Sequence, residues 1–179
     1  MNKYVYALLV VATTSLMGSA FAIGKIGLAY ASPILLVALR FTIAGIVMGI
    51  AVFFLKKPHP KTLYDWGQIF IIGFFQTAGV MGCIFVSLKT ITAGESSILT
   101  FMNPLLVIIF GTIFLRLSYR RLQWFGVVLG FIGVFITFGA HVSIKIGTLL
   151  GFLSAVSWAI GTLLIKTWGA KFNVWVLTA

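Results

Sequence analysis

The chain has 179 residues, of which 61% are hydrophobic and 8% charged, and its formal net charge is +11. Soluble domains are about 25% charged, so this composition excludes an ordinary soluble fold and favours an all-α protein that crosses a lipid bilayer several times. The basic residues stand singly or in short clusters between apolar stretches, which is typical of topology signals and argues against nucleic-acid binding. Two histidines, two carboxylates and one cysteine offer no catalytic dyad or triad and no metal-ligand spacing. We therefore expect no enzyme, no metal site and no cofactor.

Six apolar stretches are long enough to cross a bilayer as helices, which takes about 20 residues each. The first also resembles a cleaved signal peptide, because it contains Ala20-Phe21-Ala22, but its length and the later stretches favour a membrane helix. The helices are expected at residues 4–24, 33–55, 66–88, 96–115, 122–140 and 146–165. A last apolar run, 173–179, is too short to cross, so a seventh helix is expected to begin there.

The distribution of basic residues predicts the orientation of these helices. With a cytoplasmic N-terminus, nine lysine and arginine residues fall in the inner loops, three in the outer loops, and Arg40 within the membrane. Cytoplasmic loops carry the excess of such residues in membrane proteins. We therefore expect a multi-pass protein of the bacterial inner membrane with its N-terminus in the cytoplasm.

The sequence contains a weak internal repeat. Residues 8–38 match residues 149–179 at six positions with an offset of 141, and the pair Lys25 and Lys166 is among them. The offset places the first helix on the sixth, and a repeat of five helices has its second copy inverted, as in many secondary transporters. Residues 1–140 are thus expected to form one five-helix repeat and residues 146–179 the start of an inverted second one, in an incomplete chain.

Arg40 and Glu95 are the charged candidates for a functional site. Arg40 is expected about 10 Å below the outer end of its helix, where a charge costs at least a few kcal/mol unless it is paired or hydrated. Either its side chain reaches the outer surface, or it lines a cavity for an anionic or zwitterionic ligand. Glu95 is at a compatible depth to pair with it; alternatively, Glu95 stabilises the start of the fourth helix through the helix dipole.

Polar and aromatic side chains within the helices give further candidates for a substrate pathway. These are Gln76, Thr100, Asn103 and Trp158. The alternative is that the polar groups hydrogen-bond between helices and that Trp158 fills space among small residues. Gly126, Gly130 and Gly133 form a stripe on the fifth helix, which predicts close helix packing and no chemistry.

Several motifs in this order resemble the EamA family of the drug/metabolite transporter superfamily. They are Leu16-Met17-Gly18-Ser19-Ala20-Phe21 with Lys25, Pro33 with Leu39-Arg40-Phe41, Ala93-Gly94 to Pro104-Leu105, Gln123-Trp124-Phe125-Gly126 with Gly130 and Gly133-Val134, and Ser157-Trp158-Ala159 with Lys166. The resemblance implies ten membrane helices in two inverted repeats around a cavity for small metabolites or drugs. Two departures stand out: Met17 replaces a frequent tryptophan, and Arg116-Leu117-Ser118 replaces a glutamate that usually follows the fourth helix.

The leading hypothesis is therefore a secondary transporter, an exporter by expectation, that moves small organic solutes. A half-size transporter that acts as a homodimer is one alternative, although the charge bias disfavours antiparallel pairing. A membrane fragment that transports nothing is the other.

Overall fold

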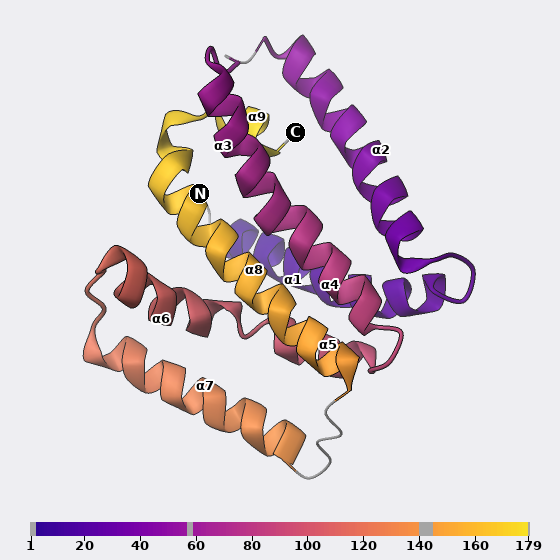
Figure 1. The fold of residues 1–179 in the computed structure, drawn as a ribbon, viewed down its shortest axis with the longest axis vertical. Coiled ribbons are helices and arrows are strands. Elements are labelled where there is room, and N and C mark those ends of the chain that lie inside the picture. The colour runs from indigo at the N-terminus through magenta and orange to yellow at the C-terminus, as the bar shows by residue number, and fades with distance from the viewer. Residues whose placement is uncertain (1–2, 57–58, 140–144, 179) are drawn as a thin grey trace.

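The computed structural model describes residues 3–56, 59–139 and 145–178, and this part of the chain is built of helices (Figure 1). Five helical spans are long and apolar enough to cross a membrane, and a sixth, Arg121–Thr137, is shorter. The five are Lys3–Gly27, Pro33–Phe54, Leu63–Ser87, Ala93–Leu115 and Ile146–Lys171. The predicted all-α polytopic membrane fold is confirmed. The predicted end of the fifth helix at residue 140 lies outside the described residues.

The first two helices, α1 (Lys3–Gly27) and α2 (Pro33–Phe54), begin and end close to the predicted boundaries. A short turn joins them, and Ser32 caps α2 because its side chain accepts a hydrogen bond from the Leu35 amide at 3.4 Å. Pro33 occupies the first position of α2, where its missing N–H costs nothing. Both helices expose most of their side chains, as lipid-facing helices do.

The third span contains a wider turn that the sequence did not predict. It consists of α3 (Leu63–Gly73), the π-helical turn η1 (Phe74–Gly79) and α4 (Val80–Ser87). The Ser157 hydroxyl donates to the Phe75 carbonyl at 2.8 Å and so ties this turn to α8. The helix expected over residues 66–88 is confirmed as one helical span, Leu63–Ser87. Its middle winds as a π turn that is tied to a neighbouring helix.

The fourth span is interrupted where the sequence analysis expected one helix over residues 96–115. It is divided into α5 (Ala93–Thr100) and α6 (Asn103–Leu115). Pro104 has no N–H to donate to the carbonyl four residues earlier, which belongs to Thr100. The proline that follows Asn103 therefore breaks the helix at residues 101–102.

Helix α8 (Ile146–Trp168) is the central helix and packs against η1, α4, α5 and α6 (Figure 1). Small side chains on its buried face allow this close packing; they are Gly147, Gly151, Ser154, Ala155, Ala159 and Gly161. A Cβ built on Gly161 would lie 2.5 Å from Oε1 of Gln76 and 3.0 Å from its backbone. Glycine is thus required where α8 meets the π turn. The chain continues through η2 (Gly169–Lys171) into α9 (Val174–Thr178), where the seventh helix was expected to begin.

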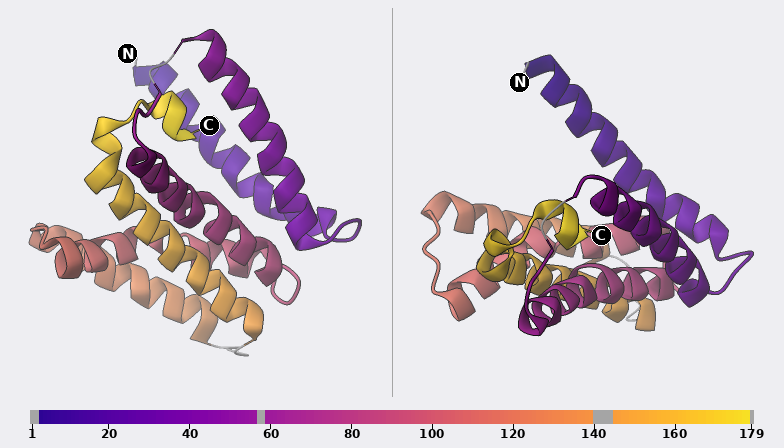
Figure 2. Two further views of the ribbon diagram at one scale, coloured as in Figure 1. Left: turned by 45° about the horizontal axis from the view of Figure 1, so that its top comes forward. Right: turned by 90° about the horizontal axis from the view of Figure 1, so that it is seen from above.

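Helix α7 (Arg121–Gly139) lies at the edge of the molecule beside α6, and α1 leans away from the bundle (Figure 2). A Cβ on Gly130 would meet the Leu105 side chain of α6 at 2.8 Å, whereas no atom lies within 4 Å of such a Cβ on Gly126 or Gly133. The close contact at Gly130 agrees with the helix packing that the glycine stripe predicts. For Gly126 and Gly133, close helix packing stays a prediction.

Candidate functional site

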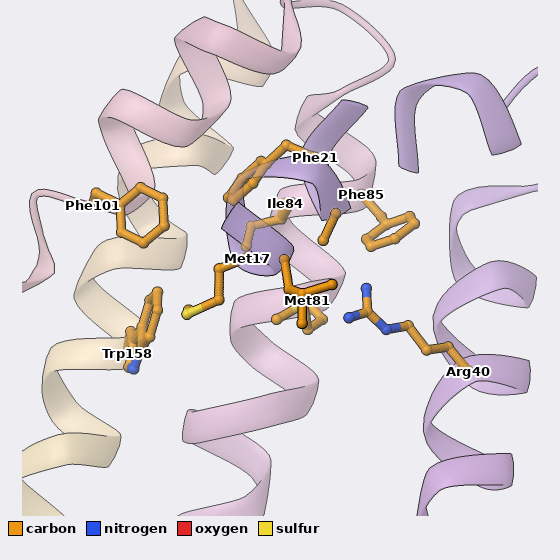
Figure 3. A pocket seen from close by; sticks show the side chains of 10 residues that line it. Met17, Phe21, Arg40, Met81, Ile84, Phe85, Phe101 and Trp158 are labelled. Carbon is orange, nitrogen blue, oxygen red and sulfur yellow. The ribbon is translucent and has the colours of Figure 1, made fainter. Parts of the chain in front are cut away.

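A pocket of about 220 Å³ lies between α1, α2, α4 and α8, next to the break between α5 and α6 (Figure 3). Its lining side chains are apolar apart from that of Arg40. The apolar ones are Leu16, Met17, Ala20, Phe21, Met81, Ile84, Phe85, Phe101 and Trp158. Four separate spans contribute together with α8, so the pocket depends on the tertiary arrangement of the helices.

Among the described residues that line this pocket, Arg40 supplies the one charged side chain. Figure 3 shows its guanidinium group pointing from α2 toward the space beside Met81 and Phe85. A second pocket, of about 460 Å³ between α1 and α2, shares four lining residues with the first: Leu16, Ala20, Arg40 and Phe85. The Phe41 ring lies 5.7 Å from the guanidinium carbon. Arg40 thus places a single positive charge where two apolar cavities adjoin.

Aromatic rings form the opposite wall of the pocket. The ring centroid of Phe101 lies 5.8 Å from that of Phe21 and 6.0 Å from that of Trp158, with tilted ring planes. Tilted pairs at this distance are favourable for aromatic side chains. Figure 3 shows the Met17 sulfur pointing toward Trp158. This wall is suited to a flat or apolar group, and a thioether adapts to its shape.

Of the residues expected in a substrate pathway, the structure brings Arg40 and Trp158 to the same pocket. Thr100 and Gln76 lie elsewhere. Thr100 is fully buried, and its hydroxyl forms a 2.8 Å hydrogen bond with the Ser154 hydroxyl of α8. The Gln76 side chain lies against Gly161, and its buried Oε1 has no hydrogen-bond partner among the described residues.

Glu95 and Asn103 also lie outside the residues that line the pocket. Glu95 belongs to a capping box at the start of α5: its carboxylate accepts the Thr92 amide at 2.7 Å, and its own amide donates to the Thr92 hydroxyl at 3.1 Å. The described residues contain no ion pair between Glu95 and Arg40. Asn103 is half-buried at the start of α6. Glu95 therefore fits the helix-start alternative.

The apolar side chains of the pocket were not predicted individually. One signal was present, because the repeat offset of 141 relates residue 17 to residue 158, and both Met17 and Trp158 line the pocket. The remaining lining residues resemble lipid-facing residues in sequence. Only the arrangement of the helices distinguishes the residues that line the pocket from those that face lipid.

Lys25 anchors the end of α1 beside the pocket. Its ammonium group donates to the carbonyl oxygen of Leu88 and, at 3.0 Å, to that of Ile91. These carbonyls lie just beyond the C-terminal end of α4, where the helix dipole favours a positive charge. The contact holds α1, which is otherwise loosely packed, against the turn between α4 and α5.

Membrane-spanning helices around a pocket with one cationic group and an aromatic wall define a polytopic membrane protein suited to bind a small solute. In the described part of the chain no group of three histidine, cysteine or acidic side chains could hold a metal ion. The chain belongs to the EamA-like transporter family, whose sequence pattern matches residues 4–139.

Several curated relatives carry transporter names. The chain is 30% identical to the uncharacterized transporter YvbV of Bacillus subtilis over 177 residues, which are 96% of this chain and 57% of that protein. It is 27% identical to an uncharacterized transporter of Archaeoglobus fulgidus, over 93% of this chain and 59% of that protein. The aromatic amino acid exporter YddG of Ancylobacter novellus is 27% identical over 72% of this chain and 45% of its own length. The chain thus spans about half the length of these relatives. No solved structure gives a significant match.

Proposed function

We propose that this chain forms the substrate-binding part of a bacterial inner-membrane secondary transporter that exports small organic metabolites or drugs. The observation that carries the proposal is the pocket in which the Arg40 guanidinium faces an aromatic wall. Ligand sites are typically concave and mostly apolar, with a few polar groups that fix orientation. Family membership supports the transport role, and YddG, an aromatic amino acid exporter by name, supports the direction.

Alternating access is the proposed mechanism, with α1 as a moving element. Helix α1 contributes Met17 and Phe21 to the pocket, leans away from the bundle, and is anchored at one end by Lys25 (Figure 2). A helix that is fixed at one end and exposed along its length can open and close a pocket that it lines. The basic-residue distribution supports a cytoplasmic N-terminus. No catalytic step is part of the proposal.

Solute flux in vesicles tests the transport role. The chain is reconstituted in lipid vesicles loaded with labelled aromatic carboxylates, aromatic amino acids or apolar drugs, and efflux is compared with that from protein-free vesicles loaded with the same solutes. We expect efflux above the background and its loss in Arg40→Gln. The control Arg120→Gln removes the same charge from an exposed loop and should leave efflux unchanged. An absence of efflux across the whole panel would favour a membrane fragment that transports nothing.

A half-size transporter that acts as a homodimer is the second candidate. The accessibility of a tag at the N-terminus distinguishes a parallel dimer, in which both copies have the same orientation, from an antiparallel one. A tag that is accessible from the cytoplasm alone supports a single orientation, as the charge bias predicts. A tag accessible from both sides of the membrane would support antiparallel pairs and contradict the predicted orientation.

A further inference from the structure

Among the described residues Arg40 has no carboxylate partner, because both acidic side chains are engaged elsewhere. The sequence contains two acidic residues, Asp65 and Glu95. Oδ1 of Asp65 lies 2.7 Å from Nζ of Lys171, and its Oδ2 accepts the Thr62 hydroxyl at 2.7 Å. The Glu95 carboxylate accepts the Thr92 amide in the capping box. The positive charge of Arg40 is therefore left without an acidic partner.

The described side chains around Arg40 offer its charge no polar partner. The two cavities that it lines contain apolar side chains and one hydroxyl, that of Ser19, which donates to the carbonyl of Leu16 in its own helix at 3.0 Å. A guanidinium group in apolar surroundings is stabilised by an anion, and its planar fork matches the two oxygens of a carboxylate. The cavity thus has a site for one negative charge.

The described residues that line the two cavities include no acidic side chain to pair with a positive charge on the ligand. The best partner for an ammonium group is a carboxylate, and the lining side chains named above include none. The faces of Phe101 and Trp158 offer such a group only the weaker cation–π contact. Burial of an unpaired charge is costly, so a ligand that carries an amine beside its carboxylate would be disfavoured. The aromatic wall of Phe101 and Trp158 favours an apolar body, preferably a ring.

We infer that this pocket binds small organic monoanions, with the carboxylate on Arg40 and an apolar or aromatic body against Phe101 and Trp158, and that it disfavours the corresponding amino acids and amines. The inference rests on the proposed function, because it names the substrate class of the proposed substrate site. It distinguishes this chain from a carrier that recognises the amino group of an amino acid.

Four ligands with a common phenyl body test this inference: 3-phenylpropionate, L-phenylalanine, phenethylamine and 3-phenylpropanol. Displaceable binding of each is measured on the full chain in phosphatidylcholine vesicles. We expect the dissociation constant of 3-phenylpropionate to be roughly tenfold lower than those of the other three, as one charge-assisted hydrogen-bonded pair provides. Equal affinity for the acid and the alcohol, or tighter binding of either amine-bearing ligand, would overturn the inference.

Variants of Arg40 test whether this side chain causes the preference for the carboxylate ligand. Arg40→Gln should remove the preference for 3-phenylpropionate over 3-phenylpropanol, Arg40→Lys should retain part of it, and the exposed control Arg120→Gln should retain all of it. A preference that survives in Arg40→Gln would overturn the assignment. If Arg40→Gln does not fold, as judged by circular dichroism, the four-ligand series on the unaltered chain still tests whether the pocket prefers the carboxylate.

Two further comparisons separate the possible sources of failure. Solute efflux without a preference for the acid would overturn the inference and leave the transport role intact. Binding of the acid through Arg40 without any efflux would support the inference and contradict transport. A lipid phosphate has the same charge as the ligand, so the series is repeated with an anionic phospholipid added. If that lipid abolishes binding of the acid, Arg40 binds a lipid headgroup and the inference is wrong.

Discussion

Met17 of α1 and Trp158 of α8 line the same pocket although they are 141 residues apart in the chain, and the Met17 sulfur points toward the Trp158 ring (Figure 3). This separation equals the offset of the internal repeat that the sequence predicts. Corresponding positions of the first and the sixth helix therefore meet at one cavity. The two residues differ in chemistry, so the cavity is not symmetric. Met17 contributes a flexible side chain, and Trp158 contributes a rigid ring.

Trp158 is expected to contribute to ligand affinity. Trp158→Ala removes the ring that faces Phe101, and an aromatic contact is worth up to about tenfold in affinity. Trp158→Phe should retain most of the effect, because a ring remains. Binding of 3-phenylpropionate or solute efflux provides the measurement. Trp168→Ala, on the same helix but outside the pocket lining, is the control. An equal loss in both alanine variants would show that general destabilisation of α8 is the cause.

The hydrogen bond between Thr100 and Ser154 is expected to couple α5 to α8. Their hydroxyl oxygens are 2.8 Å apart and fully buried. A double-mutant cycle with Thr100→Ala and Ser154→Ala should give a coupling free energy of about 0.6 kcal/mol, as for other hydrogen bonds between membrane helices. Unfolding in mixed micelles provides the free energies. Thr112→Ala is a suitable control, since Thr112 bonds only the Ile108 carbonyl of its own helix. Strictly additive effects in the cycle would contradict the coupling.

Lys25 is expected to stabilise the attachment of α1. Lys25→Met keeps the length of the side chain but loses the hydrogen bonds to the carbonyls of Leu88 and Ile91. The free energy of unfolding should fall by about 2 kcal/mol, as for hydrogen bonds from charged groups. Amide hydrogen exchange in α1 should increase, and Lys25→Arg should restore part of the protection. Lys89→Met alters an exposed lysine in the same turn and should have little effect. Unchanged exchange in Lys25→Met would refute the anchoring role.

Gly161 is expected to tolerate no larger side chain. A Cβ there would lie 2.5 Å from Oε1 of Gln76 and 3.0 Å from its backbone, so the backbone itself would have to move. Gly161→Ala should lower the free energy of unfolding by about 1–3 kcal/mol, a typical effect of overpacking. Gly126→Ala is the matched control, because a Cβ at residue 126 would have no atom within 4 Å. A comparable loss in Gly126→Ala would show that another helix packs on the glycine stripe of α7.

The sequence was sufficient to predict the helical spans because the bilayer imposes a length and an apolar character on each of them. The break between α5 and α6 and the π turn in the third span differ in how far the sequence could predict them. Pro104 was visible, yet a proline in a membrane helix is compatible with several outcomes, and the break at residues 101–102 depends on neighbouring helices. The π turn in the third span has no local signal. It is held by Ser157, which is distant in sequence.

The candidate site was predicted in part. Arg40 was conspicuous because a charge is rare within membrane helices, and Trp158 because it is the one tryptophan in the middle of a predicted helix. Thr100 and Glu95 were selected for their polarity, but in a bilayer polar groups first have to satisfy helix neighbours and helix ends. The Ser154 hydroxyl and the capping box at Thr92 are such partners. Pocket residues such as Phe101 could not be identified, because apolar side chains face lipid and cavity alike.

The π turn at Phe74–Gly79 affects which side of α4 faces the pocket. Such a wide turn amounts to one inserted residue, and one residue corresponds to a rotation of about 100° around a helix axis. Met81, Ile84 and Phe85, which follow the turn, line the pocket in the rotated register. Deletion of a single residue from this segment would turn these side chains away from the cavity without altering any of them. The set of side chains that line the pocket therefore depends on the length of a segment that does not itself line it.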